Sequence, residues 1–575
     1  MDYSELIREI NSQNWEKAGQ EIKKLQEDTL DDTAAVLAAT VCLHEGKSEE
    51  AYDYICRGLA RNDRNAELYL LLGNYYEDKN VNQAWLCYEH AEFYCDHIAD
   101  KEMIRQYKSH VESMDGWSVK NVSIVILSYN LKDICIQCID SIRKNNAPGS
   151  MELIVVDNAS SDGIVEWLRQ QEDIVCIFNQ SNKGFPYGCN QGIKAAEPDN
   201  DILLLNNDTE VLPHSIFWLR MGLYSEGRIG AAGSVSNCAA NWQMIDETFQ
   251  TIEEYRAHGR TMNLPLKNAC EKKTWLMGFA MLIRREALDG TGLLDIRFTP
   301  GGYEDNDISI RLQQNGWQLA LCHNSFIFHY GSGVGKNRDF WSSYGGANAG
   351  KLREKWGFDL LYYTRCRTDL IGYIREPKDA VIRVLEIGCG CGDTLSKIAY
   401  LWPRAEVRGV ERNEAAAKTG ANYLNIIQGD IETLVLPYEK GYFDYIILGD
   451  VLECFAHPQE TIEKMIPCLR ENGRFLCSVS NIIHESVLLS MLKGNFSYAD
   501  TGILDRSHIR FYSLTSIAEL FYKCRLRIEQ VQASVEHCEK TAEEAELLEA
   551  FYRLPHIAKK EFFQAGRYVF TAVKR

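Results

Sequence analysis

The chain has 575 residues, which at roughly 100 to 200 residues per domain predicts three or four domains rather than a single core. Acidic residues outnumber basic ones by 81 to 62, and the net charge of −19 has the wrong sign for following a phosphate backbone, so we expect no nucleic-acid partner. Hydrophobic residues make up 45% and charged residues 25%, which excludes a largely disordered chain.

No run approaches the roughly 18 apolar residues of a membrane span, and the first residues, MDYSELIREI, contain no apolar signal segment. The 19 cysteines are scattered, and Cys135 and Cys138 lack the second pair that a structural zinc site would need. We therefore expect reduced thiols and a cytoplasmic protein without a transmembrane segment, at most peripheral to the inner face of the membrane.

The first region, residues 1–115, is acidic and repetitive, with 12 basic and 24 acidic residues. Three similar segments place Ala18, Ala51 and Ala84 at intervals of 33 residues, and a fixed period of this length predicts stacked helical units. The small Gly73 would let a partner helix approach. The pattern resembles tetratricopeptide repeats, which implies a surface that docks a protein partner. A plain helical bundle is the alternative, and no catalysis is expected here.

From about residue 120 to 360, short β-branched runs alternate with helical segments, the pattern of an α/β domain with a mostly parallel sheet. Three apolar runs end in polar residues, at Asn130, at Asp157, and at Asn207 and Asp208. Because ligands of parallel sheets gather at the carboxyl ends of strands, we expect these side chains to line one crevice. Each alone would be read as an ordinary turn or helix cap.

These runs, with NKGFPYGCNQGI, WLMGFAMLIRREAL, YEDNDISIRLQQNGW and IFH, resemble the family 2 glycosyltransferases of the GT-A fold over residues 120–360. The resemblance implies a UDP- or dTDP-sugar donor and a saccharide, glycolipid or protein acceptor. It assigns donor binding to Asn130, Asp157, Gly184, Asn190 and Asn207.

The resemblance also places a divalent cation, Mg²⁺ or Mn²⁺, on Asp208, the last residue of the family's Asp-x-Asp motif, since hard cations prefer oxygen ligands. Asn206 stands where the first Asp usually does, so metal affinity should be weaker or shared. His329 resembles a further metal ligand, although a histidine after an apolar strand is as often a satisfied core residue.

The acceptor hydroxyl needs a base beside the anomeric carbon. In the family's Glu-Asp pair this role falls to Asp305, with Glu304 as its catalytic neighbour, and the clustered acids should raise the pKa of one of them. The resemblance implies an inverting mechanism. The alternative is an acidic helix N-terminus stabilised by the helix dipole.

A second α/β pattern occupies residues 365–575 and opens with VIRVLEIGCGCGDTLSKI. An acid at the end of its first apolar run is followed by alternate glycines, which permit a tight turn against a ligand, and three further runs also end in acids. The residues are Glu386, Gly388, Gly390, Gly392, Glu411, Asp430 and Asp450.

This order resembles the Rossmann-like class I methyltransferases, and the resemblance implies that those seven residues bind S-adenosylmethionine, with Glu411 on the ribose and Asp430 on the adenine. A hydride-transfer Rossmann domain is the alternative, but the glycines follow a Gly-x-Gly-x-Gly spacing. Many relatives carry Leu-Glu-His where this chain has Cys454 in the third position, so the resemblance assigns no base here. The later segment GNFSYADTGILDRSHIRFYS resembles a substrate cap in which His508 and Arg510 would contact a sugar hydroxyl.

The expected chain is therefore multidomain, an all-α repeat followed by two α/β domains, and acts as a bifunctional enzyme that transfers a sugar and O-methylates a sugar. Asn206 and Cys454 leave one alternative open. In it, one catalytic domain has decayed, and the chain is a scaffold that binds nucleotide or glycan and recruits partner enzymes.

Overall fold

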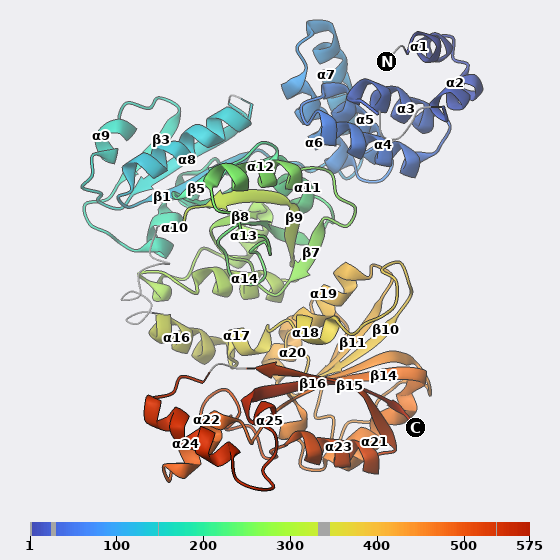
Figure 1. Cartoon of the computed structure of the whole chain (residues 1–575). Helices are drawn as coiled ribbons and strands as arrows, with labels where there is room; N and C mark the ends of the chain where they lie inside the picture. The colour runs from blue at the N-terminus through green and yellow to red at the C-terminus, as the bar shows by residue number, and fades with distance from the viewer. Residues whose placement is uncertain (1–2, 25–29, 148, 332–344, 536–537) are drawn as a thin grey trace. The chain divides into compact units, whose positions relative to one another are not determined.

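The computed structural model describes residues 3–24, 30–147, 149–331, 345–535 and 538–575 (Figure 1). Its contacts divide the chain into two compact units, Met1–Leu352 and Arg353–Arg575. Of the helices in these described ranges, none is long and apolar enough to cross a membrane.

The first unit begins with helices that pack on one another in sequence order, α3 on α4 and α5 on α6 among them. The three alanines that recur every 33 residues are fully buried, each at the fourth position of α2, α4 or α6. This confirms a helical N-terminal region, while its assignment to the tetratricopeptide repeats stays a prediction. The helices are α1 (Ser4–Asn11), α2 (Trp15–Ile22), α3 (Asp32–His44), α4 (Ser48–Arg61), α5 (Ala66–Glu77), α6 (Val81–Tyr94) and α7 (Ile98–Glu112).

Asn80 both starts α6 and ties the repeat to the α/β part of the same unit. Its side-chain oxygen accepts the N–H groups of Asn82 and Gln83, the usual work of a helix cap. Its Nδ2 donates to the carbonyls of Tyr224 at 2.9 Å and Ser225 at 3.1 Å. The helices and the following domain are therefore joined by specific polar contacts.

The α/β part of the first unit is built on one sheet with the order β3-β2-β1-β4-β8-β6-β9-β5, and β7 pairs with β9. β1 to β4 are parallel, whereas β8 runs antiparallel to both β4 and β6. The strands are β1 (Val122–Ser128), β2 (Met151–Asp157), β3 (Ile174–Phe178), β4 (Asp201–Asn206), β5 (Thr209–Val211), β6 (Ile229–Val235), β7 (Cys270–Lys273), β8 (Ala280–Ile283) and β9 (Gln318–His329).

The helices of this part cover both faces of the sheet. An unbroken apolar run such as that of β1 or β4 suits a strand buried on both faces. The helices are α8 (Lys132–Asn145), α9 (Ile164–Leu168), α10 (Phe185–Ala195), α11 (Ser215–Leu223), α12 (Ile252–Met262), α13 (Arg285–Thr291), the 3₁₀ turn η2 (Ile296–Phe298), α14 (Glu304–Gln314) and α16 (Gly346–Trp356).

The second unit has a seven-stranded sheet with the order β12-β11-β10-β13-β14-β16-β15. Its first five strands are parallel, and β16 inserts antiparallel between β14 and β15. Both predicted α/β folds are thus present. The strands are β10 (Arg383–Ile387), β11 (Glu406–Glu411), β12 (Ile426–Gln428), β13 (Phe443–Gly449), β14 (Leu469–Ser480), β15 (Leu526–Val535) and β16 (Ala565–Lys574).

Helices and short turns connect these strands. They are α17 (Leu360–Tyr363), α18 (Thr368–Ile371), α19 (Asp393–Leu401), α20 (Glu414–Gly420), η5 (Leu452–Cys454), α21 (Pro458–Met465), η6 (Ile466–Cys468), α22 (Glu485–Leu492), α23 (Leu514–Lys523), α24 (Ala542–Tyr552) and α25 (Lys560–Gln564).

Candidate active sites

Strand register brings the first set of predicted site residues to one edge of the nine-stranded sheet. β1 lies between β2 and β4, with Ser128 opposite Asp157 and Leu127 opposite Asn206. Asp208 follows two residues after the end of β4. Asp157 and Asp208 are 1% and 3% exposed. Two carboxylates buried at one strand-end edge are the arrangement that the sequence predicted.

Asp157 keeps one oxygen without a partner in the described part of the chain. Its Oδ2 accepts the N–H of Ser160 at 3.0 Å, whereas its buried Oδ1 has no hydrogen-bond partner among the described residues. Asn130 holds the same loop, since its side-chain oxygen accepts the N–H of Ser161. The buried Nδ2 of Asn207 is likewise unmatched within the described chain. Because an unpaired buried polar atom is costly, these atoms favour a bound polar ligand.

His329 lies beside Asp208 at the end of β9. Its Nε2 is 3.1 Å from the Asp208 Oδ1, and its Nδ1 donates to the Cys238 carbonyl at 2.8 Å. Its ring stacks on Phe279, with centroids 5.3 Å apart. Burial alone would lower the pKa of His329, but the hydrogen bonds to Asp208 and Cys238 outweigh burial and raise the pKa to about 10. The imidazole is therefore protonated when no cation competes for it.

A donor bond from Nδ1 to a backbone carbonyl is how metal-binding histidines commonly orient Nε2. Among the described residues no group of three His, Cys, Asp or Glu side chains gathers into a metal site. Asp208 and His329 therefore make a two-ligand set that fits a hard cation only if the donor's phosphates supply further oxygens.

Glu304 and Asp305 are the first two residues of α14, and their carboxyl groups lie in different environments. The Asp305 Oδ2 accepts the N–H of Gly278 at 3.0 Å, and its Oδ1 accepts the N–H of Asn306 at 2.8 Å. Burial and the charge of Asp305 raise the pKa of Glu304 to about 8, and burial also raises the pKa of Asp305. Two backbone N–H groups favour the charged form of Asp305, whereas burial and the Asp305 charge favour a protonated Glu304 near neutral pH.

Backbone contacts join Asp305 to the edge that bears Asp208. Gly278, which binds Asp305, directly precedes Phe279, and the Phe279 carbonyl accepts the N–H of Asn206 at 2.8 Å. Phe279 also stacks on His329. The predicted base, the predicted metal ligands and Asp157 thus border one region of the domain.

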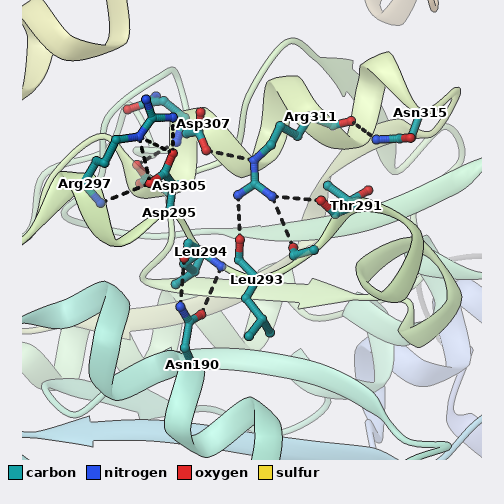
Figure 2. A network of polar contacts seen from close by, with 12 residues as sticks. Asn190, Thr291, Leu293, Leu294, Asp295, Arg297, Asp305, Asp307, Arg311 and Asn315 are labelled. Atoms are coloured by element: carbon teal, nitrogen blue, oxygen red, sulfur yellow. Dashed lines mark hydrogen bonds and ion pairs between the residues drawn. The ribbon is translucent and has the colours of Figure 1, made fainter. Parts of the chain in front are cut away.

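A polar network fixes the start of α14 (Figure 2). Arg311 pairs with Asp307 at 2.8 Å and donates to the carbonyls of Thr291 and Leu293. In the same view, the amide of Asn190 is paired in both directions with the backbone of Leu294. Asn190 was predicted to bind the donor; one N–H and one lone pair of its amide bind the Leu294 backbone, and its role toward the donor stays a prediction.

Gly184 permits a close backbone approach in front of α10. Its φ is 83°, and a Cβ there would lie 2.9 Å from the carbonyl oxygen of Pro300. The loop that bears it therefore closes onto the segment just before α14.

The second unit repeats the strand-end arrangement. The carboxyl ends of β10, β11 and β13 are level, since Ile387 lies opposite both Val410 and Leu448. Glu386 and Glu411 are 4% and 5% exposed at this edge. Burial raises the pKa of Glu386 to about 8, and its Oε2 has no hydrogen-bond partner within the described ranges. A ligand with a cationic or N–H donor group would pair with this carboxyl.

The backbone around position 390 leaves no room for a residue other than glycine. Its φ is 56°, and a Cβ there would lie 2.2 Å from the Tyr363 carbonyl oxygen, which also accepts the N–H of Cys391. Gly390 donates its own N–H to Glu411 at 2.9 Å. The glycine-rich loop is thus held between the segment that contains Tyr363 and the side chain of Glu411, the acid predicted to bind ribose.

Asp450 lies directly after β13 and contacts arginines that the sequence analysis missed. Arg367 and Arg567 approach its carboxylate to 3.2 and 3.1 Å, and Arg365 to 3.9 Å. The Arg-x-Arg pair ahead of the first strand was the available signal. Asp430, after β12, binds the N–H of Glu432.

His508 is buried in the predicted cap, at 6% exposure. Its Nδ1 donates to the Ile503 carbonyl at 3.0 Å, which leaves the lone pair on Nε2. Arg510 donates to the Ala456 carbonyl and anchors the same segment beside the β13 end.

Comparison with known families finds a matching family model for each of the two α/β domains. The family model described as "Glycosyltransferase like family 2" matches residues 120–345, and the one described as "Methyltransferase domain" matches residues 361–531. The chain carries a family 2 glycosyltransferase domain and a methyltransferase domain. Neither match includes the helical repeat.

The glycosyltransferase domain is similar to the uncharacterized glycosyltransferase YfnE of Bacillus subtilis, at 32% identity over 36% of this chain and 64% of that protein. The methyltransferase domain is similar to a malonyl-[acyl-carrier protein] O-methyltransferase of Halalkalibacterium halodurans, at 33% identity over 18% of this chain and 41% of that protein. The chain thus spans less than two thirds of either relative. A solved structure of GalNAc-T7 with UDP, GalNAc and Mn²⁺ matches 37% of this chain and 44% of its own, with 16% identity and a TM-score of 0.30.

Proposed function

We propose that the glycosyltransferase domain moves a sugar from a UDP- or dTDP-sugar to a saccharide, glycolipid or protein acceptor with inversion, and that the methyltransferase domain O-methylates a sugar with S-adenosylmethionine. One observation supports this most: at the carboxyl ends of the parallel strands, each sheet displays buried acids with oxygens that have no partner among the residues the structure describes.

In the first reaction the acceptor oxygen attacks the anomeric carbon while the bond from that carbon to the diphosphate breaks and its electron pair leaves with the phosphate. Asp305 takes the acceptor's proton, because two backbone N–H groups hold its carboxylate in place and burial raises its pKa, which strengthens it as a base. Asp208 and His329 would hold Mg²⁺ or Mn²⁺, which supplies positive charge to the departing diphosphate. Asp157 would accept from the base edge of the nucleotide.

In the second reaction an acceptor oxygen bonds to the methyl carbon as the carbon–sulfur bond breaks. Bound S-adenosylmethionine supplies the electrophilic methyl group. Glu386, Glu411 and Asp430 offer the carboxylates that its amine and hydroxyl groups need. The Nε2 of His508 would take the acceptor's proton.

Donor hydrolysis tests the first half. Full-length protein with Mn²⁺ and a panel of sugar nucleotides should hydrolyse one donor slowly, and Asp208→Ala should reduce that rate at least about 100-fold. Asp289→Ala, at a side chain that is 66% exposed on α13, is the matched control and should retain the rate. Donor binding without turnover under every condition would instead support the scaffold alternative.

Calorimetry with S-adenosylhomocysteine tests the second half. The wild-type chain should bind it, and Glu411→Ala should weaken binding at least about tenfold. The exposed Glu439→Ala should bind as the wild type does. No heat of binding from the wild-type chain would remove the cofactor assignment.

A further inference from the structure

Three arginines surround Asp450 at the carboxyl end of β13. Arg367 is buried and bonds to both oxygens of Asp369, at 2.9 and 2.7 Å, and to Ser478. Arg567 lies 3.1 Å from Asp450. Arg365 is 3.9 Å from Asp450 and makes no hydrogen bond with the part of the chain that the structure describes.

The cluster holds more positive than negative charge. Its three guanidinium groups face two carboxylates, Asp369 and Asp450. Glu453 and Glu386 lie nearby, but burial raises the pKa of each to about 8, with the Asp450 charge adding to the rise at Glu453, so both add little negative charge near pH 7. We assign the unbalanced positive charge to Arg365, because its distance to the Asp450 carboxylate is the longest of the three and its side chain is 53% exposed.

Arg365 also stands beside the predicted cofactor loop. Arg365 lies two residues after Tyr363. The Tyr363 carbonyl oxygen accepts the N–H of Cys391 and leaves no room for a Cβ at Gly390. A second cation beside a sulfonium donor raises the electrostatic cost of binding that donor unless an anion joins them. A negatively charged acceptor would remove this cost, and it would meet Arg365 before any buried member of the cluster.

We propose that the methyl acceptor is a saccharide carrying an anionic group, a carboxylate or a phosphate, and that Arg365 binds this group with Arg567 behind it. This inference rests on the proposed methyl transfer and narrows its substrate class. The buried Arg367 is a positioning residue that holds Asp450 and orients the cluster.

Titration of the full-length chain saturated with S-adenosylhomocysteine tests the proposal. Glucuronate and glucose 6-phosphate are the anionic probes and glucose is the neutral match. We expect one or both anions to bind and glucose not to bind at equal concentration. Arg365→Gln should weaken anion binding about tenfold and leave S-adenosylhomocysteine binding unchanged. Which anion binds more tightly distinguishes a carboxylate from a phosphate acceptor.

Two variants control for structure and charge. Arg527→Gln removes a 63% exposed arginine near the start of β15 that pairs only loosely with Glu529, and it should bind the anions as the wild type does. Arg365→Lys keeps the charge and should recover most of the affinity lost in Arg365→Gln.

Three outcomes would overturn the proposal. One is that neither anion binds more tightly than glucose. Another is that Arg365→Gln weakens S-adenosylhomocysteine but not 5′-methylthioadenosine, which lacks the amino-acid carboxylate, because the guanidinium would then serve the cofactor. If the wild-type chain binds no S-adenosylhomocysteine at all, the methyltransferase assignment itself fails, and this proposal fails with it.

Discussion

At the residue scale, Glu386 links a predicted cofactor contact to the stability of the chain. Burial raises its pKa from 4.5 to about 8, so the folded state holds a proton that the unfolded state releases between those values. Its contribution to stability is therefore complete below about pH 4.5 and is lost as the pH rises towards 8.

Glu386→Gln is neutral at every pH and should escape this loss. Without cofactor, the difference in melting temperature between the variant and the wild type should rise in the variant's favour by roughly 5 °C or more from about pH 5 to about pH 8.5. Thermal unfolding followed by circular dichroism measures it. The exposed Glu439→Gln should show a constant difference. A constant difference in Glu386→Gln would mean that this carboxyl is ionised in the folded chain.

Single residues also show where sequence reasoning worked. Asp157, Asp208 and Glu386 each follow an apolar run, and a parallel sheet aligns the ends of such runs, so their placement follows from local pattern and topology together. The arginines around Asp450 do not follow apolar runs, so the same reasoning does not place them. Arg365 and Arg567 are some 200 residues apart in the sequence, and only the insertion of β16 beside β14 brings them together.

At the element scale, helix contacts in the repeat depend on side-chain size. The sequence predicted that Gly73 leaves room for a neighbour, and a Cβ there would lie 2.2 Å from the Tyr88 ring. Gly73→Ala should therefore reduce the free energy of unfolding by about 1–3 kcal/mol, since the helices must separate or the ring must move.

Denaturant unfolding of the full chain measures this loss. Gly290→Ala is the matched control, because Gly290 lies in α13 with nothing within 4 Å of the added Cβ. It should be neutral or stabilise the chain by up to about 1 kcal/mol through helix propensity. Equal effects from the two substitutions would contradict the close α5–α6 packing.

Some elements were beyond sequence reasoning. The antiparallel β16 enters the second sheet between β14 and β15, although it is the last strand in the chain. Alternating polarity identifies a strand but does not say which neighbour it pairs with, because pairing depends on contacts distant in sequence. For the same reason, the sequence did not predict the contact between Tyr363 and Gly390.

At the scale of the first unit, the repeat and the glycosyltransferase domain share a buried polar junction. His90 on α6 stacks on Phe217 of α11, with ring centroids 4.1 Å apart, and its Nε2 lies 2.8 Å from the His214 Nδ1. Tyr69 approaches the same nitrogen at 3.1 Å, and Asp63 lies 3.4 Å from the other ring nitrogen of His214. The sequence suggested a separate docking module and gave no sign that α6 is held this closely.

This junction should make the first unit sensitive to acid. Burial, with the nearby charges of His214 and Arg220, lowers the pKa of His90 well below 6.5, so the folded chain keeps His90 neutral while the unfolded chain takes up a proton. Stability is therefore lost as the pH falls below about 6.5. Calorimetric unfolding should show that the fall in melting temperature from about pH 7 to about pH 5 is smaller in His90→Gln by a few degrees. His110→Gln, at a side chain that is 61% exposed on α7, should behave as the wild type does, and an undiminished acid loss in His90→Gln would place the sensitive group elsewhere.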